Sequence, residues 1–325
     1  MGMRRYLVKR AVGTLLTFVA VATIVFFMFR QLGDPAVLFM SPDMTTEQLQ
    51  SIRSSFGLNQ PLYVQYYQYL ISVFTLDFGI SFFYMEPTGP LVIYRLQNSL
   101  LLTVPAILIA YVGGVAGGVL MAWKRGESIE RGMLVTTLVF RSSPRFWVGL
   151  LLLFVFAGIL GWFPSSGMIS SDQQFTTHID LLTSVDFYMH AILPIISMTL
   201  YLMGLPMLLM RTSMLEVINE EFIDLCRAKG MKESTVMYKH AARNALLPVL
   251  TAFAVAIAFS FGGNVLVETV FSYPGIGRLM VNSAFRNDYP VAQAAFLLMA
   301  AAVLTMNFVA DILYGVLDPR VSYDE

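Results

Sequence analysis

Long uncharged apolar runs divide this chain into segments. Five runs hold no charged residue over about 20 positions, the length that a helix needs to cross a hydrocarbon layer of about 30 Å. They cover residues 11–29, 98–123, 191–210, 244–267 and 289–310. A sixth run, 132–163, is interrupted by Arg141 and Arg145, but its part from 146 to 163 alone would rise roughly 27 Å as a helix. Backbone groups in lipid must bond within the protein, so we predict an all-α polytopic membrane protein with six transmembrane helices.

Basic residues gather in alternating connections between these runs. One group precedes the first run, the second lies at 124–131 and the third at 211–243, whereas residues 161–190 contain no Lys or Arg. The positive-inside rule then places both termini in the cytoplasm. The first run also has a basic start and an Ala20-Val21-Ala22 triplet, as a cleaved signal peptide would. Because the triplet lies in the middle of the run, we expect the segment to be retained as an anchor.

Three regions follow from this topology. Residues 1–30 form a cytoplasmic stub and the first transmembrane helix, and residues 31–97 form a small extracytoplasmic helical segment. Residues 98–325 form a five-helix core with a cytoplasmic loop at about 213–243.

The extracytoplasmic segment has helical signals of its own. Thr45 with Gln48 resembles a capping box, and Gly57 fits a helix stop. Pro61 suits the first turn of a further helix. That helix would carry one apolar, aromatic face, made of Tyr63, Tyr66, Tyr67, Leu70, Ile71 and Phe74. This face fits an interfacial helix anchored by tyrosines, or a contact surface for a partner protein.

A stripe of small residues in the second run predicts close helix packing. Its members are Gly113, Gly114, Gly117 and Gly118. Overlapping pairs of small residues at a spacing of four let another helix approach backbone to backbone.

The loop at 213–243 is amphipathic and mixed in charge. Its acids come first and its bases later, which matches the dipole of a helix. Phe222, Leu225 and Cys226 would share one face, Gly230 fits a left-handed stop, and Ser234 or Thr235 could cap the next helix. The helix could lie on the lipid surface or dock into a groove of a cytoplasmic partner.

Composition narrows the class of function. The chain is 57% hydrophobic and 13% charged, about half the charged fraction of a soluble domain, which excludes an ordinary soluble enzyme and argues against disorder. Lys plus Arg equals Asp plus Glu at 21 each, so no basic excess points to nucleic acid. One Cys, three scattered His and the lack of a Gly-Lys-Ser/Thr loop predict no catalytic, metal or cofactor site in this chain.

Several motifs together resemble the permeases of ATP-binding-cassette importers, in the version of the dipeptide/oligopeptide family. The strongest lie in and after the loop: Arg227-Ala228-Lys229-Gly230, His240-Ala241 and Asn244-Ala245-Leu246-Leu247-Pro248. Others, in order along the whole chain, include Asp77-Phe78-Gly79, Asn98-Ser99, Trp162-Phe163-Pro164, Glu268-Thr269 and Asp288-Tyr289.

The resemblance implies a permease of the plasma or inner membrane that imports peptides by alternating access. A second homologous permease, two cytoplasmic ATP-binding subunits that hold ATP and Mg, and an extracytoplasmic substrate-binding protein would be its partners. Related systems carry nickel, glutathione or oligosaccharides, so the cargo stays open.

The resemblance also implies that residues 221–230 form the coupling helix that docks on an ATPase. The residues carried over to this role are Glu221, Phe222, Asp224, Leu225, Arg227, Ala228, Lys229 and Gly230. A Glu-Ala-Ala triplet of the broader pattern reads Asp224-Leu225-Cys226 here, so only the acid character of its first position is kept.

Ionisable residues inside membrane runs are functional candidates. Arg141 and Arg145 flank Pro144, where a helix kink is expected, and their spacing of four predicts one shared helix face. They could line the pathway and hold a carboxylate or an anionic cargo, or anchor the helix at the inner interface. In the family, a small polar residue is more common at the position of Arg145.

Other polar residues of the runs have less specific roles. Asp311 could pair with an Arg of a neighbouring helix or lie at the interface, and Asn264 and Asn307 fit interhelical hydrogen bonds. His240 fits a surface or docking role better than a metal site, and Cys226 a packing role.

The sequence fits two other classes of membrane protein less well. An ion-coupled secondary transporter would have buried acids in several spans and broken helices in matching halves, but the runs are nearly free of acids. A polytopic membrane enzyme would need clustered catalytic groups at one membrane face, and the sequence offers none.

Overall fold

A computed structural model describes residues 3–31, 59–173, 178–260 and 264–317, together with 45, 47, 50 and 54. Helices dominate this described part, and its only β pairing is an isolated bridge between Ile80 and Pro87. The all-α prediction is therefore confirmed. The predicted signals at Gln48 and Gly57 lie outside the described residues.

The chain divides into two compact units, Met1–Asn98 with Gly275–Glu325, and Ser99–Ser260 with Asn264–Pro274. The first unit contains α1 (Met3–Gln31), α3 (Leu62–Thr75), the start of α4 (Thr88–Trp123), α15 (Ile276–Phe285) and α16 (Tyr289–Leu317). The second unit contains the rest of α4, then α5 (Ser128–Ser142), α6 (Arg145–Leu152), η2 (Leu153–Ile159), α7 (His178–Thr183), α8 (Val185–Leu202), α9 (Gly204–Val217), α10 (Glu221–Ala228), α11 (Glu233–Thr235), η3 (Val236–Ala241), α12 (Ala242–Ala245), α13 (Leu247–Ser260) and α14 (Val265–Val270).

Among the described residues, four stretches are long and apolar enough to cross a membrane as one helix. They are Tyr6–Arg30, Thr88–Trp123, Val185–Val217 and Tyr289–Ile312. Two bent pairs pass the same test when taken together: Ser128–Ser142 with Arg145–Ile159, bent by 105°, and Glu233–Ala245 with Leu247–Ile257, bent by 60°. The described residues thus supply four candidate spans, or up to six if each bent pair is one span.

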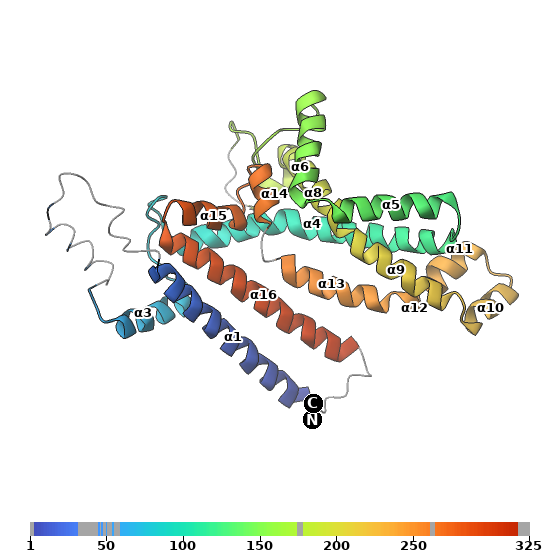
Figure 1. Ribbon diagram of the computed structural model, residues 1–325, viewed down its shortest axis with the longest axis horizontal. Helices are drawn as coiled ribbons and strands as arrows, with labels where there is room; N and C mark the ends of the chain where they lie inside the picture. The colour runs from blue at the N-terminus through green and yellow to red at the C-terminus, as the bar shows by residue number, and fades with distance from the viewer. Residues whose placement is uncertain are drawn as a thin grey trace. The chain divides into compact units, whose positions relative to one another are not determined.

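The first unit is built on α1 and α16, which run beside each other (Figure 1). Small and apolar residues of the two helices form a buried cluster that includes Ala22 and Val25 of α1 and Ala292 and Leu297 of α16. Small side chains at this contact allow the helices to approach closely, which is the usual way that helices associate in lipid.

The tyrosine-rich helix α3 begins after Pro61, as predicted, but its aromatic residues divide between two faces. Tyr69 donates a hydrogen bond to the carbonyl of Ala22 at 3.0 Å, and the Tyr66 hydroxyl lies 2.7 Å from that of Thr23. Tyr63 and Tyr67 point outward and are 75% and 65% exposed. One edge of α3 therefore packs on α1, and the interfacial or partner-binding alternatives apply only to the outward edge.

A buried carboxylate fixes the turn before α4. Asp288, 1% exposed, accepts hydrogen bonds from the backbone N–H groups of Phe82 at 3.1 Å and Phe83 at 3.2 Å, and from the Ser81 hydroxyl. These donors satisfy a charge that would otherwise be costly to bury. The contact joins positions more than 200 residues apart.

In the second unit, the glycine stripe of α4 packs against α9, as predicted. A Cβ added at Gly114 would lie 2.7 Å from Pro206 Cγ, and one at Gly118 would lie 2.6 Å from the Met207 carbonyl oxygen. Only glycine permits this approach. Close packing of α9 on α4 positions the segment that follows α9.

Candidate functional site

The segment predicted to couple to an ATPase forms a short helix, α10, that begins and ends sharply. Glu220 is extended at its N-terminal boundary, with φ −78° and ψ 143°. Gly230 has φ +72°, the left-handed conformation that glycine adopts without strain, so the predicted stop is confirmed. All eight residues carried over from the family pattern are exposed, so they are available to a partner.

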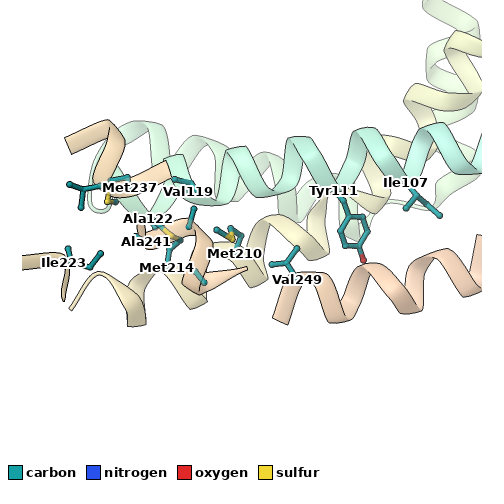
Figure 2. Close-up of a cluster of buried hydrophobic side chains, with 13 residues drawn as sticks. Ile107, Tyr111, Val119, Ala122, Met210, Met214, Ile223, Met237, Ala241 and Val249 are labelled. Carbon is teal, nitrogen blue, oxygen red and sulfur yellow. The ribbon is translucent and has the colours of Figure 1, made fainter. Parts of the chain in front are cut away.

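One side of α10 is anchored in the unit. Ile223 is fully buried in a hydrophobic cluster with Met210 and Met214 of α9 and Met237 of η3 (Figure 2). Side chains of α4 and α13 complete the cluster. Burial of this kind stabilises by about 1.5–3 kcal/mol per large apolar side chain, so α10 is held on the helices that it connects.

The outward side of α10 carries Phe222 and Leu225, which are 36% and 56% exposed. Cys226 instead packs against the buried cluster, so the prediction that it shares the outward face is wrong, whereas its predicted packing role is confirmed. Sequence reasoning missed Ile223. Phe222 with Leu225 and Ile223 with Cys226 both lie at a spacing of three, and periodicity could not decide which pair faces inward.

An ion pair ties α10 to the next helix. Arg227 donates through Nη2 to Glu233 Oε1 at 2.9 Å, and through Nη1 to Asp224 Oδ1 at 3.4 Å. The hydrogen bond with Glu233 raises the pKa of Arg227 above its usual range. The next helix begins after Lys232, not after the predicted caps Ser234 or Thr235, and this places Glu233 opposite Arg227.

A second ion pair links α9, which precedes α10, to α5. Arg211 donates through Nε to Glu130 Oε1 at 2.8 Å, and the other oxygen of Glu130 accepts the backbone N–H of Gly126 at 2.6 Å. Both side chains are largely buried. The turn between α4 and α5 is thereby connected to the helix that leads into α10.

Arg141 and Arg145 do not share a helix face, contrary to prediction. Ser143 and Pro144 are extended, with ψ 142° and 130°, and the helices on either side are bent by 105°. The ring of Pro144 disfavours helical geometry at Ser143, and proline has no N–H to continue the helix. Arg141 therefore lies in the last turn of α5, with its stem over Gly204 of α9, and Arg145 begins α6.

Arg145 is an exposed cation held by neutral groups. Its guanidinium lies 4.0 Å from the centre of the Tyr201 ring, and Nη1 donates to Asn264 Oδ1 at 3.4 Å. Within the described part of the chain, no acidic side chain forms an ion pair with it. Arginine stacked on an aromatic ring is preoriented for a carboxylate, so this cation can receive an anion from outside the chain.

Asn264 connects Arg145 to a buried polar group. Its side chain donates to the Thr103 hydroxyl of α4 at 3.4 Å, so the predicted interhelical hydrogen bond is confirmed. Its backbone N–H lies 3.3 Å from Oε1 of Glu268, which is 1% exposed and also accepts from the Ser99 hydroxyl at 2.7 Å. Sequence reasoning noted Glu268 and Ser99 within motifs but assigned them no role.

Asp311 and Asn307 belong to the first unit. Asp311 accepts an ion pair from Arg10 of α1, which confirms the pairing alternative. Asn307 lines a cavity between α1 and α16 and has no hydrogen bond with the described residues, so its predicted interhelical bond is absent there. His240 is half-buried in η3.

Comparison with known proteins settles the family. The family described as "Binding-protein-dependent transport system inner membrane component" matches residues 114–323, and the one described as "Binding-prot-dependent transport system membrane comp, N-term" matches residues 3–87. The chain belongs to this family. It is a permease subunit of an ATP-binding-cassette importer, a transport component and not an enzyme, and a multi-pass protein of the cell membrane.

Individual relatives of the permease align over almost their whole length. The oligopeptide transport system permease protein AppB of Bacillus subtilis is 36% identical over 99% of this chain and 100% of its own length. The glutathione transport system permease protein GsiC of Escherichia coli K12 is 33% identical over 99% and 100%. In fold, the permease resembles the inward-facing MetNI methionine ABC transporter, with a TM-score of 0.53, 18% identity and coverage of 70% of this chain and 96% of that chain.

Proposed function

We propose that this permease carries peptides, and that it forms the membrane pathway together with a second homologous permease. An extracytoplasmic substrate-binding protein delivers the cargo, and two cytoplasmic subunits bind ATP and Mg. The names of the relatives support this cargo class, because one refers to oligopeptides and the other to glutathione, which is itself a modified tripeptide.

Six spans with both termini in the cytoplasm suit this role. Four single helices and two bent pairs supply the spans. The basic connections at 124–131 and 211–243 then lie on the same side as the N-terminus. In this orientation α10 faces the cytoplasm, where the ATPases are.

The observation that carries the coupling role is the two-sided packing of α10. Ile223 is buried in the unit, while Phe222 and Leu225 on the other side are exposed. A short helix with an exposed apolar pair and charged flanks fits a hydrophobic groove on a partner. Residues 221–230 therefore dock on an ATPase, and Glu221, Asp224, Arg227 and Lys229 form the polar rim of the contact.

Closure of the ATPases on ATP moves α10, and the packing described above carries this movement into the spans. The buried cluster passes it to α4 and α9, and the Arg211–Glu130 pair passes it to α5. Packed helices move as rigid bodies between discrete arrangements. Alternating access needs only two such arrangements, open to opposite sides.

Arg145 lines the pathway in this proposal, and Arg141 serves as an anchor at the end of α5. The exposed guanidinium of Arg145 attracts the free carboxylate of a passing peptide. Its neighbours Tyr201 and Asn264 are neutral, so they orient the guanidinium without neutralising it. A weak site of this kind holds cargo briefly and still releases it.

The docking proposal is tested by co-expressing the permease with the second homologous permease, the two ATPase subunits and the substrate-binding protein. We expect the double variant Phe222→Ala/Leu225→Ala to lose copurifying ATPase and ATP-dependent peptide uptake. A matched control, Leu15→Ala/Ile24→Ala, removes two exposed apolar side chains from α1 and should retain both. Retention of the ATPases and of uptake in the α10 variant would overturn the docking role.

A further inference from the structure

A cavity of about 560 Å³ lies between the N-terminal half of α1 and the C-terminal half of α16, within the first unit. Gly13 forms part of its wall, and a Cβ added there would meet no atom within 4 Å. The cavity therefore offers open space next to α1 that a ligand could occupy. Its polar lining includes Lys9, Arg10, Asn307 and Asp311.

The lining is donor-rich and carries a net positive charge. Arg10 is paired with Asp311, which leaves the charge of Lys9 uncompensated within the described residues. The Asn307 amide likewise has no hydrogen-bond partner there. Thr14 and Thr17 already donate to carbonyls of their own helix, those of Arg10 and Gly13. An ammonium, an amide NH₂ and the remaining N–H groups of an arginine suit the oxygens of a phosphate.

The position of the cavity along α1 indicates what kind of molecule carries the phosphate. The cavity lies where the charged start of α1 passes into its apolar run. On the same stretch, Val8, Val12 and Leu16 are exposed, by 63%, 50% and 65%, and this surface suits lipid. Leu304 and Phe308 add apolar wall to the cavity itself. A ligand with a phosphate at one end and hydrocarbon at the other matches both parts.

We propose that this cavity binds the headgroup of an anionic phospholipid. The phosphate lies against Lys9 and Arg10, Asn307 donates to it, and the first part of an acyl chain follows Leu304 and Phe308. Bound there, the lipid contacts both α1 and α16 and adds to the Arg10–Asp311 pair in holding the two helices together. This site is separate from α10 and from Arg145, and it does not depend on the nature of the cargo.

The test uses the full chain with its partner subunits, incorporated in nanodiscs that contain equal amounts of phosphatidylglycerol and phosphatidylcholine. Native mass spectrometry then counts the lipids retained after release from the disc. We expect the wild-type protein to retain phosphatidylglycerol preferentially. Lys9→Gln should lower that retention about five-fold, the change that one basic residue near an anionic surface brings. The control Lys239→Gln changes an exposed lysine outside the cavity and should have no effect.

A second variant separates the cavity from the charge. Gly13→Leu fills the open space while keeping every charged group, and it replaces a poor helix former with a good one, so the protein should fold and lose the retained lipid. Equal retention in the wild type, Lys9→Gln and Gly13→Leu would overturn the proposal. Competition by millimolar inorganic phosphate as effective as by phosphatidylglycerol would also overturn it, in favour of a soluble phosphate site. Absence of retained phosphatidylglycerol from the wild-type complex would overturn it as well.

Discussion

Arg211 on α9 and Glu130 on α5 form an ion pair with 2.8 Å between Nε and Oε1. The carboxylate is 9% exposed and the guanidinium side chain 25% exposed, so neither group is fully solvated if the other is removed. Removing one partner of such a pair is more damaging than removing both, because a single buried charge remains.

Arg211→Met should therefore lower the stability of the permease by about 2 kcal/mol and weaken the coupling of ATP hydrolysis to uptake. The double variant Arg211→Met/Glu130→Met leaves no isolated charge and should recover part of the stability. Thermal unfolding of the purified protein measures the stability of both variants. A double variant less stable than Arg211→Met would contradict the assignment.

Two glycines offer a matched pair for the packing of α9 on α4. Gly118→Ala places a Cβ 2.6 Å from the Met207 carbonyl oxygen and should destabilise the protein by about 1–3 kcal/mol, the cost of overpacking. Gly132→Ala on α5 meets no atom within 4 Å and should raise stability by up to about 1 kcal/mol, through helix propensity. Equal melting temperatures for the two variants would argue against the close approach of α9.

The Arg227–Glu233 pair is exposed, so its contribution to stability should be below about 1 kcal/mol. Its effect should be seen in transport, because the pair fixes α10 relative to the next helix. We expect Arg227→Gln to reduce ATP-dependent uptake without changing the melting temperature. Since Arg227 also belongs to the docking rim, the informative variant is Glu233→Gln, which should reduce uptake in the same way. Normal uptake with Glu233→Gln would mean that the ion pair does not position α10.

The pathway role of Arg145 is tested by the charge of the cargo. Arg145→Ser should reduce uptake of peptides with a free carboxyl terminus and affect peptides with an amidated terminus much less. Arg145→Lys keeps the charge but loses the planar group that stacks on Tyr201, so its effect should be intermediate. If complex assembly is normal and both peptide types are taken up as by the wild type, Arg145 is an interfacial anchor.

The sequence predicts well whatever depends on local pattern. Four of the apolar runs coincide with helices long enough to cross a membrane, Gly230 marks the end of α10, and the glycine stripe marks a close helix contact. These features follow from length, backbone freedom and side-chain size within one segment.

Features that depend on contacts between distant residues could not be predicted from the sequence. The Asp288 contact with Ser81 and the adjacent backbone spans more than 200 positions, and no short pattern marks it. Ile223, and not Phe222, faces inward because it packs against methionines of α9 and η3. At Pro144 the local signal was present, but the shared face of Arg141 and Arg145 required the helix to continue through it.

The burial of Ile223 makes α10 part of the same cooperative block as α4, α9 and α13. A helix held only at its two ends could unfold under an applied force and would then not transmit the displacement to other helices. A force on α10 must instead displace α4, α9 and α13 with it, or expose several large buried side chains to water. In the proposed coupling role, α10 moves together with these helices, so the size of its displacement is limited by how far they can tilt.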